Sequence, residues 1–356
     1  MKEIYTVLNE LLERGDSAVV ATIVKQSGSS PRGVGTKCLI KDGCLLAGTI
    51  GGGLLEANAM REAENVLDTG LPVVQRFSLD LSNASEPGMI CGGVVELFLE
   101  PVTPRQNGQP ELTREILKSL VDGETGLLLT LVDERWWNEG EIPKMFIRKG
   151  GEKIGLLPNG RHFTDALIPD PEEIIRSKKP ALFSLQDDEG KPVTLFAEPV
   201  IPGTTLTIFG AGHVSRKVAP LADTVGFQVA VIDDREGFAS GVHFPAAIRT
   251  STLPFEGVMD LLSVNGNSFL LIVTRGHLQD ELILGQALKT RATYIGMIGS
   301  RSKRETIYKR LQEQGFTEED LNRVCSPVGL DIGAETPEEI AVSIVAELIQ
   351  ARKLSR

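Results

Sequence analysis

The sequence has few cysteines, histidines and aromatic residues. Four cysteines among 356 residues include no Cys-x-x-Cys pair, so they do not form the disulfide framework of a small secreted protein. The four histidines are scattered without the spacing of a zinc site, which predicts that protein ligands alone hold no metal. Cys38 and Cys44 flank an Asp42-Gly43 hairpin turn that would pair Cys38 with Ala47 and point the two thiols to opposite faces.

Long apolar runs and an excess of positive charge are also absent. No apolar run approaches the roughly 18 residues of a membrane span, and the first residues mix acids with leucines instead of forming an export signal. The formal charge of -11 argues against nucleic-acid binding, which needs a surplus of Lys and Arg on some face. We therefore expect a soluble, cytoplasmic protein with no nucleic-acid or membrane partner.

The length and the residue pattern predict two domains. A chain of 356 residues exceeds the size at which one core usually divides. Residues 1–200 read as an N-terminal α+β domain, mostly β over 103–200, and residues 201–356 alternate strands with helices. The predicted fold class is α/β, with an N-terminal α+β domain followed by a Rossmann-like parallel-sheet domain.

Two octapeptides resemble each other, VELFLEPV at 95–102 and VTLFAEPV at 193–200. They are either equivalent strands that leave one sheet or a chance likeness of two strand endings. The sequence does not choose between these alternatives.

The C-terminal half opens with a strand, a glycine motif, a helix and a second strand. Gly210 permits a tight turn, Gly212 would let the backbone approach a pyrophosphate at a helix N-terminus, and Ser215 allows close helix packing. Asp233 ends the second strand, where it would reach ribose hydroxyls. The pattern predicts a Rossmann-like unit, and it leaves the identity of any bound nucleotide open.

Polar residues follow the later strands of this half at their carboxyl ends, where open α/β sheets bind ligands. His213 lies in a first helical turn and either packs against the loop or contacts a ligand. His277 follows another strand, and Ser300 and Arg301 begin a helix and would suit an anion. The alternative for the basic residues is a solvated helix face.

Together these segments resemble the XdhC/CoxI family, accessory factors for the maturation of xanthine dehydrogenase and related molybdenum hydroxylases. Residues of roughly 103–190 carry little of the likeness. The segments that carry it are GSSPR (28–32), GTIGGGLLEA (48–57), CGG (91–93), FGAGHVS (209–215), VIDDR (231–235), YIGMIGSR (294–301) and PVGLDIGAETPEEIAVSI (327–344).

The resemblance implies a chaperone that binds the molybdenum cofactor, protects it while its terminal sulfido ligand is installed, and inserts it into the apo-enzyme. Its partners would be apo xanthine dehydrogenase or a related hydroxylase and a cysteine desulfurase; homo-oligomerisation stays open. Some relatives carry a cysteine after the glycine-rich turn, where this chain has Leu54, so any thiol role must fall elsewhere.

A molybdopterin needs anion-binding turns, hydrogen-bond donors and a soft ligand or sulfur carrier. Cys91 would be a thiol that handles sulfur or touches the metal, or else a small buried hydrophobe. Glu56 would accept a hydrogen bond from the pterin, or else be a helix-surface acid. The N-terminal cofactor-binding candidates are Ser29, Ser30, Arg32, Gly51, Gly52, Gly53, Glu56, Gly92 and Gly93.

Other functions remain compatible with the sequence. The glycine motif and Asp233 would also suit an NAD(P)-dependent oxidoreductase, although no acid-base residue is evident beyond His213 or His277. Four dispersed cysteines cannot ligate two iron-sulfur clusters, which excludes a complete xanthine dehydrogenase. A subunit of such a complex and a pure scaffold both stay compatible with the sequence. We expect an accessory factor rather than a stand-alone catalyst, with glycine loops of both halves forming one pocket.

Overall fold

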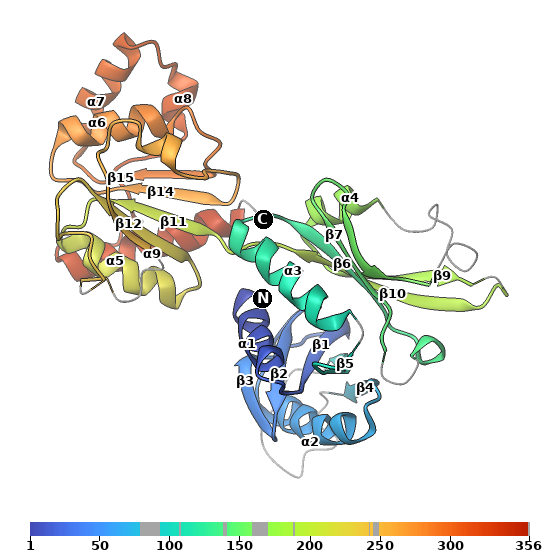
Figure 1. The fold of residues 1–356 in the computed structure, drawn as a ribbon. Helices are drawn as coiled ribbons and strands as arrows, with labels where there is room; N and C mark the ends of the chain where they lie inside the picture. The colour runs from blue at the N-terminus through green and yellow to red at the C-terminus, as the bar shows by residue number, and fades with distance from the viewer. Residues whose placement is uncertain are drawn as a thin grey trace. The chain divides into compact units, whose positions relative to one another are not determined.

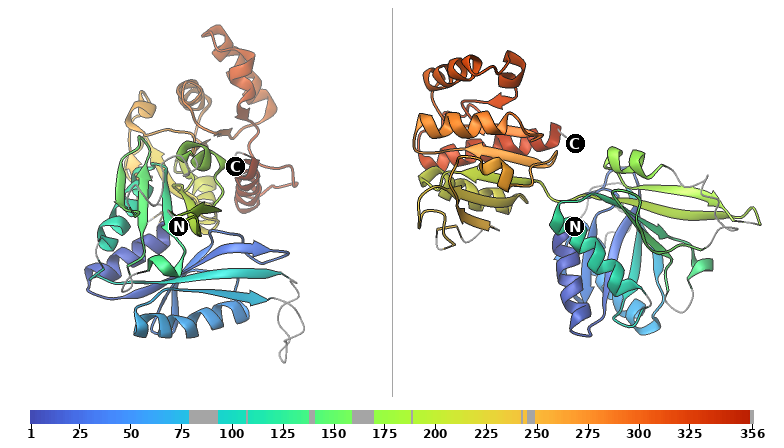
Figure 2. Two further views of the ribbon diagram at one scale, coloured as in Figure 1. Left: turned by 90° about the vertical axis from the view of Figure 1, so that its right-hand side faces the viewer. Right: turned by 45° about the horizontal axis from the view of Figure 1, so that its top comes forward.

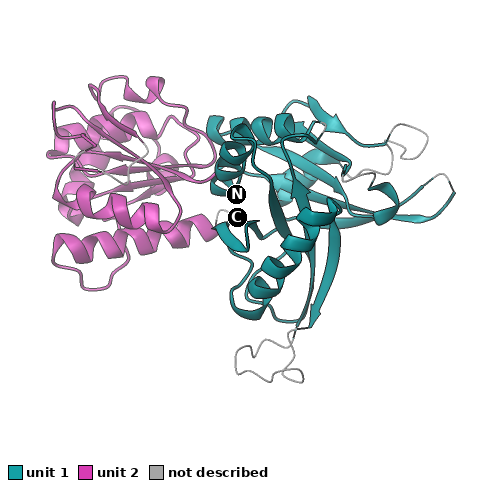
Figure 3. Cartoon of the chain, turned by 60° about the horizontal axis from the view of Figure 1, so that its bottom comes forward, with its two compact units in different colours: residues 1–202 teal, residues 203–356 magenta. Residues whose placement is uncertain are grey.

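The computed structural model folds into two compact units, Met1–Pro202 and Gly203–Arg356 (Figure 1; Figure 3). It combines antiparallel sheets and helices in the first unit with a parallel sheet in the second, which confirms the predicted fold class. No helix in the described part of the chain is long and apolar enough to cross a membrane. The structure describes residues 1–78, 93–106, 108–137, 141–158, 170–187, 189–241, 243–244 and 249–354.

The first sheet is antiparallel, with strand order β3-β2-β1-β5-β4. Helix α2 covers one face of it (Figure 2), because Leu55, Ala59, Ala63 and Val66 recur at helical spacing and pack on the strands. The elements of this half are α1 (Lys2–Glu13), β1 (Ala18–Ser27), β2 (Lys37–Lys41), β3 (Cys44–Gly48), α2 (Gly53–Thr69), β4 (Val73–Ser78) and β5 (Val94–Val102).

The second sheet is also antiparallel, with strand order β8-β7-β6-β10-β9. Helix α4 places Ile174 in the apolar core on its outer face. The elements of this half are α3 (Gln109–Asp122), β6 (Gly126–Leu131), η2 (Glu134–Trp136), β7 (Lys144–Arg148), β8 (Lys153–Leu156), α4 (Pro171–Ser177), β9 (Ala181–Gln186) and β10 (Pro192–Val200).

The two sheets are built alike. In each half a helix precedes three consecutive strands, a second helix and two further strands, and the strand orders correspond one to one. Thr22 on β1 lies opposite Lys37 and Phe98, as Thr130 on β6 lies opposite Lys144 and Phe196. The first unit therefore consists of two structurally equivalent halves.

This duplication explains the two similar octapeptides. Residues 95–102 lie on β5 and residues 193–200 form most of β10, and these strands hold the same position in their sheets. The octapeptides are thus equivalent strands, but of two different sheets rather than of one.

Helices α1 and α3 share one apolar core with both sheets. Leu8 of α1 and Ile116 of α3 are buried together with Leu39 of the first sheet and Phe146 of the second. Phe98 and Phe196 join a smaller cluster that again takes residues from both sheets. The two halves of the first unit are therefore packed face to face across a continuous interior.

Two buried ion pairs cross between the halves. Lys37 Nζ lies 2.8 Å from Glu198 Oε2, and Lys144 pairs with Glu100. Each lysine begins the second strand of its own half, and each glutamate lies on the last strand of the other half. Such reciprocal contacts are the mark of a two-fold relation, here between two parts of one chain.

The second unit contains a six-stranded sheet of order β13-β12-β11-β14-β15-β16, in which every neighbouring pair is parallel. Helices α5 and α9 pack on one face and α6, α7 and α8 on the other. Its elements are β11 (Thr205–Phe209), α5 (His213–Thr224), β12 (Gln228–Asp233), β13 (Arg249–Thr252), η4 (Val258–Leu261), β14 (Ser268–Ile272), α6 (His277–Ala287), β15 (Tyr294–Met297), α7 (Arg301–Glu313), α8 (Glu318–Asn322), β16 (Val324–Cys325) and α9 (Pro337–Leu354).

The order in which successive strands are added to this sheet reverses between β11 and β14, although the strands themselves are parallel. Strands β12 and β13 extend the sheet on one side of β11, and β14, β15 and β16 extend it on the other. Ligands of open α/β sheets bind beyond the carboxyl ends of the strands at such a switch point. The predicted glycine motif follows β11 directly at this place.

Candidate functional site

The N-terminal motifs meet at one end of the first sheet. A Cβ atom on Gly51 would lie 3.2 Å from Pro31 Cβ, and one on Gly93 would lie 2.2 Å from the backbone oxygen of Ser29. The structure thus brings together the loop after β1, the turn before α2 and the start of β5. Cys91 and Gly92, two of the predicted residues, lie outside the described residues.

The turn before α2 requires glycine at three successive positions. Gly51, Gly52 and Gly53 have φ angles of 129°, 78° and 58°, a region that side chains with a Cβ rarely adopt. A Cβ on Gly52 would meet no atom within 4 Å, so the outer side of the turn is open. The sequence GTIGGG therefore encodes a backbone shape that leaves room beside the helix N-terminus.

Glu56 holds this turn from inside. Its Oε1 accepts hydrogen bonds from Thr49 Oγ1 at 2.6 Å, Ile50 N at 3.1 Å and Gly52 N at 3.0 Å. Burial opposes ionisation of the carboxyl group, but these hydrogen bonds outweigh it and lower the pKa of Glu56. The amides of Ile50 and Gly52 are thus occupied by the protein's own carboxylate, and only Oε2 of Glu56 could accept from a ligand.

The loop after β1 presents exposed polar groups at the same place. Ser30 Oγ donates to the backbone oxygen of Arg32 at 3.0 Å, which fixes the loop internally. The side chains of Ser29 and Arg32 are exposed. These two exposed side chains are open to a ligand, whereas Glu56 occupies two backbone donors of the neighbouring turn.

Three helices of the second unit begin at the carboxyl edge of its sheet. Their N-caps are Gly212 for α5, Gly276 for α6 and Ser300 for α7. A Cβ on Gly212 or Gly276 would meet no atom within 4 Å, so the space beside both N-termini is open. Because free backbone N–H groups and the helix dipole favour negative charge there, this edge is suited to an anion.

The predicted residues His213, His277 and Arg301 are the first residues of these three helices, and all three side chains are exposed. Ser300 Oγ accepts from the backbone N–H of Lys303 at 3.2 Å and so caps α7. The strand ends thus gather the guanidinium of Arg301, the imidazoles of His213 and His277 and three helix N-termini at one edge.

Gly210 is used for packing, in contrast to Gly212. Its φ angle is 103°, and a Cβ there would lie 2.5 Å from the backbone oxygen of Val273. The predicted tight turn therefore lets the ends of β11 and β14 approach each other. Ser215 donates its hydroxyl to the backbone oxygen of Gly210, which closes the turn onto α5.

Asp233 is directed inward, and its oxygens are occupied. Its side chain is 2% exposed; Oδ2 accepts from Ala211 N at 2.7 Å and Arg235 Nη2 at 2.9 Å, and Oδ1 from Arg235 N at 3.0 Å and Nε at 2.8 Å. Although burial opposes ionisation, the hydrogen bonds to Arg235 and Ala211 lower its pKa. Four donors use the acceptor positions of a carboxylate, so the predicted contact with a ribose finds no free oxygen.

A buried acid that the sequence did not mark as functional joins two of the strand-end loops. Asp280 on α6 is fully buried, pairs with Lys303 on α7 and accepts from Thr274 Oγ1 at 2.6 Å. The helical spacing between Gly276 and Asp280 was the available signal, because it turns the acid toward the loop before its own helix. Asp280 therefore fixes the relative position of two of the three N-termini.

The described cysteines do not form a soft-ligand site. Burial raises the pKa of Cys38 to about 12, and burial together with Glu347 raises the pKa of Cys325 to about 11. Both are therefore protonated at neutral pH and poor nucleophiles. Within the described residues, no group of three or more His, Cys, Asp or Glu side chains could hold a metal ion.

Fold and site together define a two-unit protein in which a duplicated α+β unit precedes a Rossmann-type unit with three helix N-termini at the carboxyl edge of its sheet. Residues 11–78 match the model of the XdhC and CoxI family, and residues 206–348 match that of the XdhC Rossmann domain. These matches cover more than half of the chain. The protein belongs to the XdhC and CoxI family, as its sequence motifs predicted.

Relatives match over nearly the whole chain. A probable xanthine dehydrogenase subunit of Bacillus subtilis is 28% identical over 359 residues, which is 99% of this chain and 98% of that protein. The molybdenum cofactor insertion chaperone PaoD of Escherichia coli is 20% identical over 343 residues, 96% of this chain and 86% of that protein. A crystal structure described as a xanthine dehydrogenase from Bacillus halodurans matches with a TM-score of 0.79 at 26% identity, over 99% of this chain and 97% of that one.

Proposed function

We propose that this protein is an accessory factor of xanthine dehydrogenase or a related molybdenum hydroxylase, which binds the molybdenum cofactor and delivers it to the apo-enzyme. Membership of the XdhC and CoxI family and similarity to the insertion chaperone PaoD support this role. The observation that carries it is the edge of the second unit, where open helix N-termini and Arg301 gather. This edge offers backbone donors and the positive charge of Arg301 to an anionic ligand.

The phosphate or nucleotide end of the cofactor fits this edge. Space beside Gly212 and Gly276 admits phosphate oxygens to the N–H groups of α5 and α6, and Arg301 adds a cation at α7. When bound, the cofactor would bring the molybdenum and dithiolene sulfur that the receiving enzyme requires. The residues of this chain bind the anionic end, and Asp280 holds their loops in place.

Cys91 is the thiol assigned to the sulfuration step in this proposal. It stands two positions before Gly93 in the sequence, and Gly93 lies against Ser29. The raised pKa values of Cys38 and Cys325 make those thiols unsuitable for the same role. A cysteine desulfurase would be the sulfur donor.

The alternative, an NAD(P)-dependent oxidoreductase, is not supported by the geometry around Asp233. A dinucleotide-binding enzyme uses this acid for the ribose, whereas here Arg235 and Ala211 occupy it. The same edge would still accept a nucleotide carried by the cofactor, because phosphate recognition does not depend on Asp233.

The test is to produce the protein in cells that make the cofactor, purify it without oxygen and measure bound molybdenum and pterin. We expect both to be retained, and Arg301→Ala to reduce retention about tenfold or more, since a hydrogen bond to a charged group contributes roughly 1.5–3 kcal/mol. Arg310→Ala is the matched control, because Arg310 lies on the same helix but its cation pairs with Glu281.

Two results would contradict the proposal. One is saturable NADH binding with turnover and no pterin retention. The other is cofactor retention that Arg301→Ala and Arg310→Ala leave equally unchanged. For the thiol, Cys91→Ala is compared with Cys44→Ala, an exposed cysteine of the first sheet, and only the former should impair sulfuration of the delivered cofactor.

A further inference from the structure

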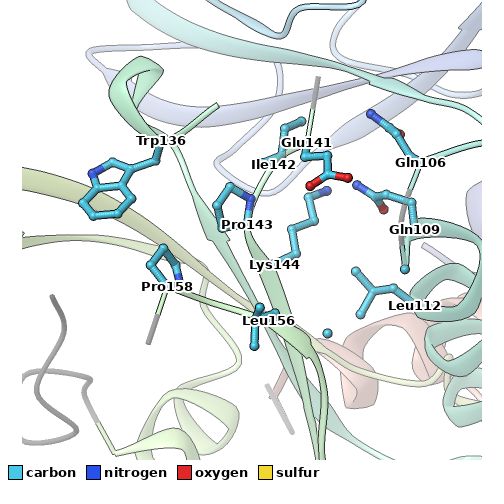
Figure 4. A pocket seen from close by; sticks show the side chains of 12 residues that line it. Gln106, Gln109, Leu112, Trp136, Glu141, Ile142, Pro143, Lys144, Leu156 and Pro158 are labelled. Atoms are coloured by element: carbon cyan, nitrogen blue, oxygen red, sulfur yellow. The ribbon is translucent and has the colours of Figure 1, made fainter. Parts of the chain in front are cut away.

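A pocket of about 360 Å³ lies in the second half of the first unit, between the N-terminus of α3 and the strands β7 and β8 (Figure 4). Leu112, Ile142 and Leu156 supply apolar walls. Gln109, Glu141 and Lys144 bring their polar groups to the same pocket. The volume falls in the range of sites for small organic molecules.

Gln109 carries an unsatisfied donor in this pocket. Its side chain is 7% exposed, and its Nε2 has no hydrogen-bond partner among the described residues. A buried donor without a partner costs roughly 1–3 kcal/mol, so native proteins seldom keep one without a reason. A carbonyl oxygen of a bound molecule would supply the missing acceptor.

The charges of the pocket favour a neutral ligand. Lys144 is already paired with the buried carboxylate of Glu100 from the other half, so its charge is compensated. Glu141 is exposed and can accept an N–H from a ligand, but would repel a phosphate. Gln109 as donor and Glu141 as acceptor together match a carbonyl next to an N–H, the lactam edge of an oxidised heterocycle.

The two-fold relation gives this pocket a counterpart. Gly48 and Gly155 are equivalent. A Cβ on Gly48 would lie 2.4 Å from the backbone oxygen of Lys37, and a Cβ on Gly155 would lie 2.5 Å from that of Lys144. Residues 49–51 follow Gly48 and lead into the glycine turn of the first half. Residues 156–158 follow Gly155 in the second half, where Leu156 and Pro158 line the pocket. In the first half Glu56 fills the turn, whereas in the second half Leu156 and Pro158 line the pocket.

We infer that this pocket binds a planar heterocycle through a lactam edge, the chemistry shared by a pterin and an oxopurine. Gln109 Nε2 donates to the ligand carbonyl, Glu141 accepts its N–H, and Trp136 at the other end offers an aromatic face. The inference rests on the proposed function, because the pterin of the cofactor is a heterocycle of this kind.

The experiment is calorimetric titration of the full-length protein with free pterin, hypoxanthine and adenine. Adenine lacks the carbonyl and is the negative probe. We expect saturable binding of pterin or hypoxanthine and none of adenine. Gln109→Leu should weaken binding about 3- to 10-fold, the usual effect of one hydrogen bond. Gln314→Leu, which removes an amide that donates to Glu281 in the second unit, should change nothing.

The stability of the variant separates binding from folding. Because Gln109→Leu removes a buried donor without a partner, its unfolding temperature should not fall. Pterin binding identifies the ligand as a pterin, and hypoxanthine binding without pterin identifies it as an oxopurine. Absence of binding by both, or binding that Gln109→Leu leaves unchanged, overturns the inference.

The two proposals fail separately. Molybdenum cofactor retained by a protein that binds neither free heterocycle refutes this pocket but not the chaperone function. Free pterin bound through Gln109 by a protein that retains no molybdenum cofactor refutes the chaperone function and leaves the pocket assigned.

Discussion

Removing one member of a buried ion pair between the two halves of the first unit should destabilise that unit strongly. The perturbation is Lys37→Met, which keeps the length of the side chain and deletes its charge. Lys37 and Glu198 have 6% and 1% of their side chains exposed, and Lys37 Nζ also donates to Thr22 Oγ1 at 3.0 Å. The variant leaves Glu198 charged, buried and without its cation.

The expected cost is about 3–5 kcal/mol, the usual penalty for leaving a buried charge unpaired. A unit of this size loses about 2–4 °C in unfolding temperature per kcal/mol, so the transition of the first unit should fall by roughly 6–20 °C. Lys144→Met should cost a similar amount, because Lys144 and Glu100 form the equivalent pair. The double variant Lys37→Met/Glu198→Leu should recover most of the loss, since an apolar pair of similar volume is tolerated there.

Differential scanning calorimetry of the full chain measures these changes. Lys25→Met is the control, because Lys25 pairs with Glu96 at 3.3 Å on the surface, where 60% of its side chain is exposed. Exposed pairs contribute about 0–1 kcal/mol, so this control should shift the transition by no more than a few degrees. A loss for Lys37→Met no larger than for Lys25→Met, or a double variant as unstable as the single one, would refute the argument.

Two further predictions concern the turns at the end of the first sheet. Glu56→Gln should lower the free energy of unfolding at pH 7 by about 1.5–3 kcal/mol. Because the folded pKa of Glu56 is below its ordinary 4.5, this difference should vanish as the pH falls through the folded pKa. Urea unfolding at several pH values measures the difference. Gly93→Ala should lower the free energy of unfolding by about 1–3 kcal/mol, because its Cβ would lie 2.2 Å from the backbone oxygen of Ser29. Gly33→Ala, whose Cβ would meet no atom within 4 Å, should be nearly neutral. Equal stabilities of the two alanine variants would contradict this packing.

The parallel sheet of the second unit was predictable because its signals are local. Strands β11, β14 and β15 are short apolar runs, and each leads through glycine or a capping residue into a helix. Gly212, Ser300 and Arg301 could therefore be placed at strand ends from the sequence alone. The hydrogen-bond partners of the Asp233 oxygens could not be predicted, because Arg235 reaches back to Asp233 only once the loop has folded.

The duplication of the first unit was not predictable in the same way. Equivalent residues such as Thr22 and Thr130 keep their type, but the loops between strands differ in length, so no constant spacing relates the halves. Only β5 and β10 retain a visible likeness. The partners of Lys37 and Lys144 lie far along the chain, and no local pattern indicates a buried ion pair.

The strand register of the β2–β3 hairpin was also not predictable from its turn residues. The turn at Asp42-Gly43 was predicted to place Cys38 opposite Ala47, and this register was wrong. A bulge between Leu39 and Ile40 shifts the pairing, so Cys38 lies opposite Gly48. The turn residues fix the pairing next to the turn, whereas a bulge depends on the packing that follows.

The reciprocal lysine and glutamate contacts suggest how the first unit is related to simpler proteins. A polypeptide containing only one such half would have a lysine and a glutamate that cannot reach each other within the same molecule. Two copies meeting across an axis would satisfy both, as subunits of symmetric dimers do. The unit therefore has the construction of a homodimer joined into a single polypeptide. Within one polypeptide each half can change without the other: the first holds its glycine turn with the carboxylate of Glu56, and the second lines a cavity with Leu156 and Pro158.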